Sequence, residues 1–206
     1  GLDFGNRGLE PLTPLPHVGS VILGTDHERV MRLITHLEAM VERRAVAWSK
    51  VNAGTIVDYR RLADAPTEPR IFLLLDGLAA FRQAYEVAGR FHWIDRLGAI
   101  AGAGRQLGIH LVVSVDQRNG VPSPLAPVIQ GRIVLRMSDE DCTALGEPDD
   151  VFTPETPPGR GLSAGYEMQI AVLGGSMDPA RKGTGTAALE RRKCAKGNGR
   201  AGRRQT

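Results

Sequence analysis

Residues Arg70 to Phe81 read RIFLLLDGLAAF, and this stretch decides the fold of the chain. Five consecutive apolar residues, Ile71 to Leu75, lead directly into Asp76 and Gly77, and a helix-forming segment follows. An apolar run of this length without alternation predicts a strand covered on both faces, as in the middle of a parallel sheet. Open α/β sheets bind their ligands at the carboxyl ends of such strands. Asp76 is therefore the first candidate functional residue.

Asp76 has two interpretations from the residues alone. A carboxylate at this position can hold a magnesium ion, directly or through water. Alternatively, Asp76 caps the helix that follows, because Asp is a favoured capping residue and Gly77 permits a sharp turn. The local sequence is compatible with both roles.

A second apolar run, Ile109 to Val115 (IHLVVSV), reaches Asp116. Helical segments around 78–87 and 93–106 separate it from the first run, which is a βαβ pattern. If the two strands are neighbours, Asp76 and Asp116 lie on the same edge of the sheet. The chain is therefore predicted to be an α/β domain with a mostly parallel sheet flanked by helices.

Shorter elements are predicted on both sides of this pattern. Along the chain they are a strand end at Leu2–Phe4, a strand at His17–Leu23, a helix from about Asp26 to Lys50 with Thr25 and Glu28 as a capping box, a helical turn at Ile56–Leu62, a strand at Arg132–Met137, a helix at Ser138–Leu145, a glycine turn at Gly159–Gly161 and a last strand at Glu167–Leu173.

The composition is that of one globular domain. The chain has 206 residues, of which 42% are hydrophobic and 24% charged, and no apolar run approaches the roughly 20 residues of a membrane helix. We therefore expect a cytoplasmic location, with the full-length protein anchored at the inner face of the cell membrane as a further option. Cys142 and Cys194 form no CxxC pair, and the five histidines lack ligand spacing, so no zinc site is predicted.

The charge is unevenly distributed. Residues 176–206 contain nine Lys or Arg against two acids, a surplus of seven. Because the whole chain has a net charge of +3, the part before residue 176 has a net charge of −4. We expect residues 176–206 to be a basic, disordered tail, which could touch nucleic acid or an anionic membrane, or could have no function at all.

Several segments together resemble the FtsK/SpoIIIE superfamily of RecA-like ATPases. The likeness covers about residues 3–175 and is nearest to actinobacterial multi-ATPase proteins of the EccC type, which serve type VII secretion. The segments that carry it are LPHVGSVILGT (15–25), ERVMRLITHLEAMVERR (28–44), FLLLDGLAAF (72–81), GRQLGIHLVVSVDQR (104–118), GRIVLRMSDEDCTALG (131–146) and PPGRGL (157–162).

This resemblance implies a RecA-like domain that binds ATP and Mg²⁺ and works beside other ATPase domains or subunits in a ring or tandem array. By position, Asp76 resembles the Mg²⁺-site acid, and Asp116 falls where the family has a polar sensor of the γ-phosphate. Arg160 could reach a neighbour's phosphate as an arginine finger, or could hydrogen-bond carbonyls of its own loop. The family moves either secreted polypeptides or double-stranded DNA.

Three departures from the family pattern predict weak or absent catalysis. The phosphate-binding loop GxxxxGK[ST] is absent from the sequence, and the family would place it just before Gly1. Gly77 stands where active members carry a glutamate that orients the attacking water. Asp116 stands where active translocases usually carry Gln. We therefore expect residues 1–175 to be part of a degenerate ATPase domain.

Three functions remain open at this stage. The first is a degenerate ATP-binding domain of a type VII secretion-like motor, and the second is part of a DNA translocase for chromosome partitioning or conjugation. The third is a non-catalytic interaction module. The net charge of −4 before the tail argues mildly against DNA.

Overall fold

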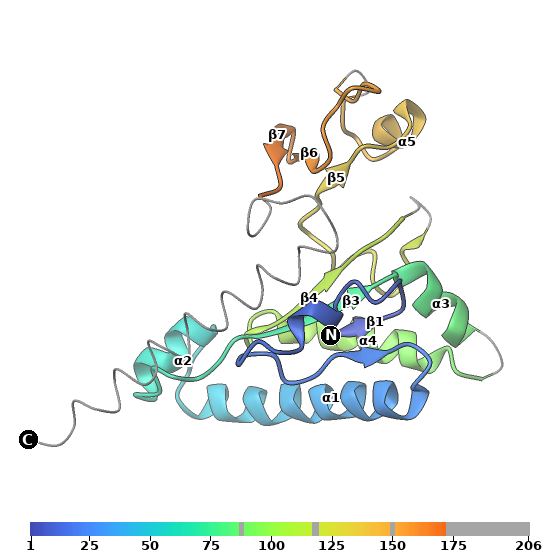
Figure 1. Cartoon of the computed structure of the whole chain (residues 1–206). Helices are drawn as coiled ribbons and strands as arrows, with labels where there is room; N and C mark the ends of the chain where they lie inside the picture. The colour runs from blue at the N-terminus through green and yellow to red at the C-terminus, as the bar shows by residue number, and fades with distance from the viewer. Residues whose placement is uncertain (87–88, 117–119, 149–150, 172–206) are drawn as a thin grey trace, which may run out of the picture. The chain divides into compact units, whose positions relative to one another are not determined.

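The computed structural model describes residues 1–86, 89–116, 120–148 and 151–171 (Figure 1). The predicted tail lies outside these residues. By their internal contacts the residues form two units, one of Gly1–Gly8 and Ile22–Gln130, the other of Leu9–Val21 and the chain from Gly131. The elements of the first unit are β1 (Leu2–Asp3), β2 (Ile22–Leu23), α1 (His27–Lys50), α2 (Ile56–Leu62), β3 (Ile71–Asp76), α3 (Leu78–Glu86), α4 (His92–Gly104) and β4 (Ile109–Val113).

The first unit contains a four-stranded parallel sheet with the order β2-β1-β3-β4. Strands β3 and β4 pair from Ile71 beside Ile109 to Leu75 beside Val113. Strand β1 lies on the other side of β3 and places Asp3 beside Asp76. The predicted α/β fold with a parallel sheet is confirmed, as are the strand end at the start of the chain and the helical turn at α2.

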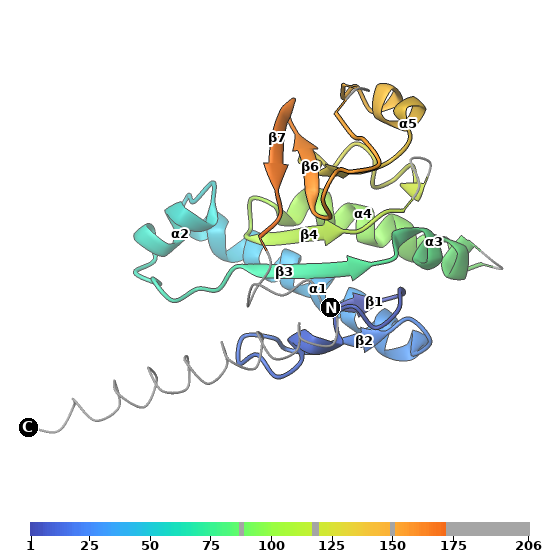
Figure 2. The same ribbon diagram turned by 45° about the horizontal axis from the view of Figure 1, so that its top comes forward.

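The hydrophobic core of this unit lies on one face of the sheet. Helices α1 and α4 contact each other and lie together behind the strands in Figure 2. Their apolar side chains pack with the side chains that point to that face. The buried members of this core are Leu2, Ile22, Val30, Ile34, Leu37, Leu73, Leu75, Leu78, Phe81, Tyr85, Ile94, Leu97, Ile100, Ile109 and Leu125.

The prediction that β3 is covered on both faces is wrong for this structure. Leu73 and Leu75 are buried, but Phe72 is 59% exposed, and Val112 of the neighbouring strand is 50% exposed. The Phe72 ring stacks on His110 with 5.2 Å between the ring centroids. Successive side chains of a strand point to opposite faces, and α1 and α4 lie on one of those faces. The apolar run therefore has one covered face and one open face.

Helix α1 begins one residue later than its predicted capping box. The N-cap is Asp26, whose side chain accepts a hydrogen bond from the backbone N–H of Arg29, so the prediction of Thr25 as the cap is wrong. Val30, Ile34 and Leu37 are buried at helical spacing, as predicted. These three side chains therefore attach one face of the helix to the core.

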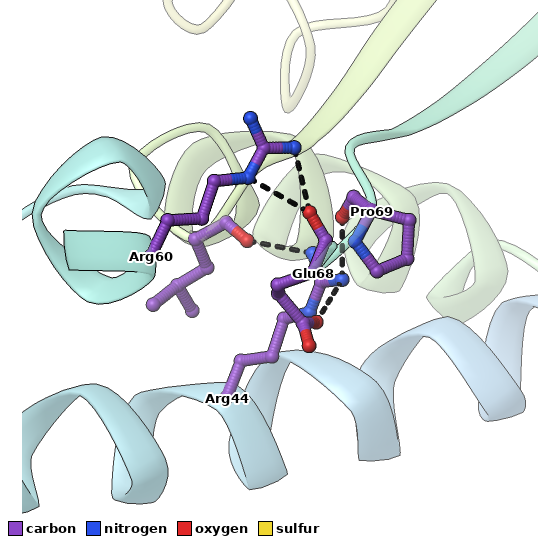
Figure 3. Close-up of polar contacts among 5 residues, drawn as sticks. Arg44, Arg60, Glu68 and Pro69 are labelled. Carbon is purple, nitrogen blue, oxygen red and sulfur yellow. Dashed lines mark hydrogen bonds and ion pairs between the residues drawn. The ribbon is translucent and has the colours of Figure 1, made fainter. Parts of the chain in front are cut away.

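Arg44 of α1 is buried and holds together the segments that precede β3 and β4 (Figure 3). Its guanidinium donates to the carbonyl oxygens of Leu107 (2.8 Å) and Pro69 (2.7 Å) and to the carboxylate of Glu68 (2.6 Å). Arg60 of α2 donates to the carbonyl oxygen of Glu68 at 2.6 Å and 2.9 Å. We call these contacts the Arg44 cluster. It connects α1 and α2 with the amino-terminal ends of β3 and β4.

The second unit is built on an antiparallel sheet of three strands with the order β5-β6-β7. Its small core contains Val134, Cys142 and Leu162. Ser138 caps α5 through the backbone N–H of Asp141, as predicted. The elements of this unit are the short 3-10 helix η1 (Glu10–Leu12), β5 (Val134–Leu135), α5 (Asp139–Ala144), β6 (Arg160–Ser163) and β7 (Tyr166–Gln169).

Several predicted boundaries need correction. The strand predicted at His17–Leu23 is reduced to β2, and that at Arg132–Met137 is reduced to β5. The predicted glycine turn at Gly159–Gly161 is the start of β6 from Arg160 on. The last strand ends at Gln169, and residues 172–173 of the predicted strand lie outside the described residues. None of the helices described is both long and apolar enough to cross a membrane.

Candidate functional site

Asp76 is the last residue of β3, and its side chain is held by Ser114, the residue that follows β4. The hydroxyl of Ser114 donates to Asp76 Oδ1 at 2.5 Å, and the same hydroxyl accepts from the backbone N–H of Gly77 at 2.9 Å. The backbone of Ser114 is also fixed, because its N–H donates to Leu75 and its carbonyl accepts from Leu78, both at 3.0 Å. Ser114 thus supports the start of α3 and orients the Asp76 carboxylate.

The end of β1 covers the other side of this carboxylate. A Cβ atom at Gly5 would overlap Asp76 Oδ2, and one at Gly8 would lie 3.2 Å from the same oxygen. The backbone N–H of Phe4 donates to the carbonyl oxygen of Asp76 at 2.9 Å. Asp76, Gly77, Ser114 and the segment Phe4–Gly8 form one corner at the carboxyl end of the sheet. We call this set the Asp76 corner.

Asp116 is placed differently from the prediction. Strand β4 ends at Val113 rather than reaching Asp116, and the side chain of Asp116 is exposed three residues beyond that end. Ser114 is the residue of this segment that contacts Asp76. A sensor role for Asp116 stays a prediction.

Arg160 belongs to the second unit, where it begins β6. Its guanidinium forms an ion pair with Glu167 of β7 at 3.4 Å, and its backbone N–H donates to the carbonyl oxygen of Pro157 at 3.1 Å. The side chain therefore contacts the neighbouring strand of its own hairpin. A contact with a neighbour's phosphate stays a prediction.

The Asp76 corner offers oxygen ligands of the kind that Mg²⁺ prefers. Mg²⁺ usually binds one or two carboxylates and completes its shell with water and substrate phosphates. Within the described part of the chain, no group of three or more His, Cys, Asp or Glu could hold a metal by itself. The corner therefore fits a magnesium ion that is held jointly with a nucleotide, and does not fit a dedicated protein-only metal site.

Sequence reasoning missed Ser114, because its contact depends on the register of the two strands. Leu75 and Val113 are paired in the sheet, so the next residue of each strand, Asp76 and Ser114, lies at the same edge. The hydroxyl of Ser114, inside the run 109–115, and the acid that follows the run 71–75 are the two side chains that this register brings together. Alignment of the two runs end to end sets Asp116 beside Asp76 instead, so the contact follows only from the observed register.

Comparison with known proteins agrees with this fold. A sequence model of the FtsK/SpoIIIE family matches residues 1–160. The ESX secretion system protein EccC of Thermomonospora curvata is 29% identical over 177 residues, which cover 83% of this chain and 13% of that protein. The ESX-4 secretion system protein EccC4 of Mycobacterium tuberculosis is 30% identical over 175 residues, or 83% of this chain and 14% of that protein.

The solved structure of Thermomonospora curvata EccC (ATPases 2 and 3), in complex with a signal sequence peptide, is similar with a TM-score of 0.77 and 27% identity. The similarity covers 92% of this chain and 35% of that one. This chain therefore spans a small part of the relatives it resembles. The family model matches residues 1–160 of 206, which is more than half of the chain. The chain belongs to the FtsK/SpoIIIE family.

Proposed function

We propose that this chain is part of a degenerate ATPase domain of a type VII secretion motor, and that the domain holds ATP and Mg²⁺ with little or no hydrolysis. The observation that carries the proposal is the Asp76 corner, where an oriented carboxylate at the carboxyl end of β3 is followed by glycine. The similarity to EccC proteins supports the assignment to protein export.

In this proposal Asp76 binds the magnesium ion and Ser114 keeps its carboxylate in place. Magnesium, when bound, neutralises charge on the β and γ phosphates of ATP. The chain's own residues provide one oriented carboxylate, whereas the amide cradle and lysine of a phosphate loop are absent from the sequence. Tight binding therefore requires phosphate ligands from a further segment or domain. Asp116 is proposed as a secondary contact, and Arg160 as a contact to the phosphate of a nucleotide bound by a neighbouring ATPase domain or subunit.

Little hydrolysis is expected because Gly77 has no side chain that could orient or deprotonate a water molecule. With phosphate ligands from a further segment or domain in place, the metal and the Asp76 carboxylate would hold the nucleotide without turnover. A nucleotide that is held without turnover can stabilise one arrangement of a multi-domain protein, because any ligand stabilises the state that binds it. The proposed role is therefore structural support by bound ATP.

The proposed partners are neighbouring ATPase domains or subunits in a ring or tandem array, and a secreted polypeptide. One solved relative contains two ATPase domains with a bound signal sequence peptide, which supports both proposals. Double-stranded DNA is not favoured, since the relatives named above are secretion proteins. The net charge of −4 before residue 176 points the same way.

Calorimetric titration with ATP and Mg²⁺ tests the proposal. It is made on this chain and on a version extended at its amino terminus by a phosphate loop of the family, each beside its Asp76→Ala variant. The control is Glu42→Ala, which removes an exposed carboxylate of α1. We expect Mg²⁺-dependent binding by the extended form, a loss of at least about tenfold in affinity for Asp76→Ala, and wild-type affinity for the control.

Phosphate release is measured on the same samples. The proposal predicts no release above the background of the Asp76→Ala variant. Steady Mg²⁺-dependent turnover by the extended form would refute the proposal that the domain holds ATP without hydrolysis. Equal affinity of the Asp76→Ala and unmodified forms for ATP and Mg²⁺ would show that Asp76 does not contribute to binding.

A further inference from the structure

Gly77 combines a backbone conformation that other residues rarely adopt with little room for a side chain. Its φ angle is +79°, in the left-handed region. A Cβ atom at this position would lie 3.0 Å from the carbonyl carbon of Phe4 and 3.1 Å from both its oxygen and the nitrogen of Gly5. These are backbone atoms, which cannot turn aside as the tip of a flexible side chain can. A side chain at residue 77 therefore meets two separate obstacles.

The obstructing segment is itself held firmly. The ring of Phe4 packs edge-on against Phe81 with 5.2 Å between centroids, and a Cβ atom at Gly24 would overlap that ring. Strand β1, which leads into Phe4, is paired on both sides, with β2 and with β3. Movement of the Phe4 backbone away from Gly77 would break contacts in the core and in the sheet. The end of β1 is thus a fixed wall of the Asp76 corner.

We propose that the end of β1 closes the position after Asp76 against any side chain, so that the corner is structurally committed to glycine and cannot accept a water-orienting glutamate. This inference rests on the proposed function and deepens it. If the loss of the acid were a single substitution in an otherwise active site, space for the acid would remain beside Asp76. Instead, the Phe4–Gly5 backbone lies within 3.1 Å of the position that the first side-chain carbon would take.

The test compares alanine at two glycines with the same backbone angle. Gly89 has a φ angle of +74°, and a Cβ atom placed on it would have no described atom within 4 Å, so Gly89→Ala reports the left-handed conformation alone. Gly77→Ala reports the same strain together with the contacts to Phe4 and Gly5. Thermal unfolding of both variants, beside the unmodified chain, separates the two effects. Gly77→Glu is added to test whether the acid can be restored.

We expect Gly77→Ala to unfold at least about 4 °C below Gly89→Ala. Gly77→Glu should be less stable than Gly77→Ala. In the form extended by a phosphate loop, it should show no more phosphate release than the extended form that keeps Gly77. Equal unfolding temperatures for the two alanine variants, or turnover by a folded Gly77→Glu, would overturn the inference. If Gly77→Glu does not fold, the unfolding temperatures of Gly77→Ala and Gly89→Ala still test the inference. The unfolding comparison needs no nucleotide, so failure of ATP binding would count against the proposed function and not against this inference.

Discussion

Replacement of Arg44 by alanine is expected to destabilise the chain strongly. Arg44 is 5% exposed, and its guanidinium donates to two backbone carbonyls and to Glu68. It also lies over the Trp48 ring, 5.5 Å from the centroid. Alanine removes the charge partner of the Glu68 carboxylate in this cluster, and leaves the carbonyls of Leu107 and Pro69 without that donor.

The size of the effect follows from these contacts. Removal of one partner of a buried ion pair costs about 3–5 kcal/mol, and each buried acceptor left unsatisfied costs about 1–3 kcal/mol. Glu68 is 29% exposed, so water can partly replace its lost partner and the low end of the range applies. We therefore expect Arg44→Ala to lower the free energy of unfolding by about 3 kcal/mol. Arg44→Lys keeps the charge but loses the planar fork, and should lose about 1–2 kcal/mol.

Urea unfolding followed by tryptophan fluorescence measures both variants. Arg43→Ala is the matched control, because Arg43 is the neighbouring residue of the same helix and is exposed. A change within about 0.5 kcal/mol is expected for this control. If Arg44→Ala were as stable as Arg43→Ala, the Arg44 cluster would contribute nothing to folding. If lysine and alanine at position 44 had equal effects, the contribution of the charge would be refuted.

Two further predictions concern the corner and the core. Ser114→Ala should lose about 1 kcal/mol of stability, because one hydrogen bond to Asp76 and one from Gly77 are removed. Ser114→Thr keeps the hydroxyl and should keep the stability of the unmodified chain. Equal unfolding midpoints for the unmodified chain and both variants would contradict the role assigned to Ser114. Burial raises the pKa of Tyr85, against a smaller opposing effect of Arg90, so the folded state keeps the phenol proton to a higher pH than the unfolded state. Stability should therefore fall as the pH rises above about 10, the pKa of an unfolded tyrosine. Between pH 9 and pH 11, the denaturant midpoint of Tyr85→Phe should fall less than the midpoint of the unmodified chain.

The long elements could be predicted from the sequence because their patterns are local. The apolar run at 71–75 predicted β3, and apolar residues at helical spacing predicted α1. The lengths of the short strands depend on their partners instead. Strand β1 has two residues, so β2 can pair over only two residues although seven were predicted. Pairing of this kind is not visible in the local sequence.

The open face of the sheet and the Ser114 contact were missed for related reasons. The hydrophobicity of the run 71–75 shows that its residues can be buried. The placement of α1 and α4 determines which of these residues are buried. Likewise, Asp76 and Ser114 are 38 residues apart in the chain and meet only through the pairing of β3 with β4. Thr25 and Asp26 are both good capping residues, and only the structure shows that Asp26 is used.

The Arg44 cluster and the Asp76 corner lie at opposite ends of the same two strands, and the sheet register connects them. Pro69 and Leu107, which accept from Arg44, come two residues before the first paired residues, Ile71 and Ile109. Strand β3 then runs about 20 Å to its carboxyl end, where the same register brings Asp76 beside Ser114. A slip of one residue would turn each side chain to the other face of the sheet. Because Arg44 fixes the start of both strands at once, its effect on stability and the geometry of the candidate site have a common origin. An Arg44→Lys variant that remains folded should therefore weaken magnesium-dependent nucleotide binding in the extended form, although residue 44 belongs to neither wall of the corner.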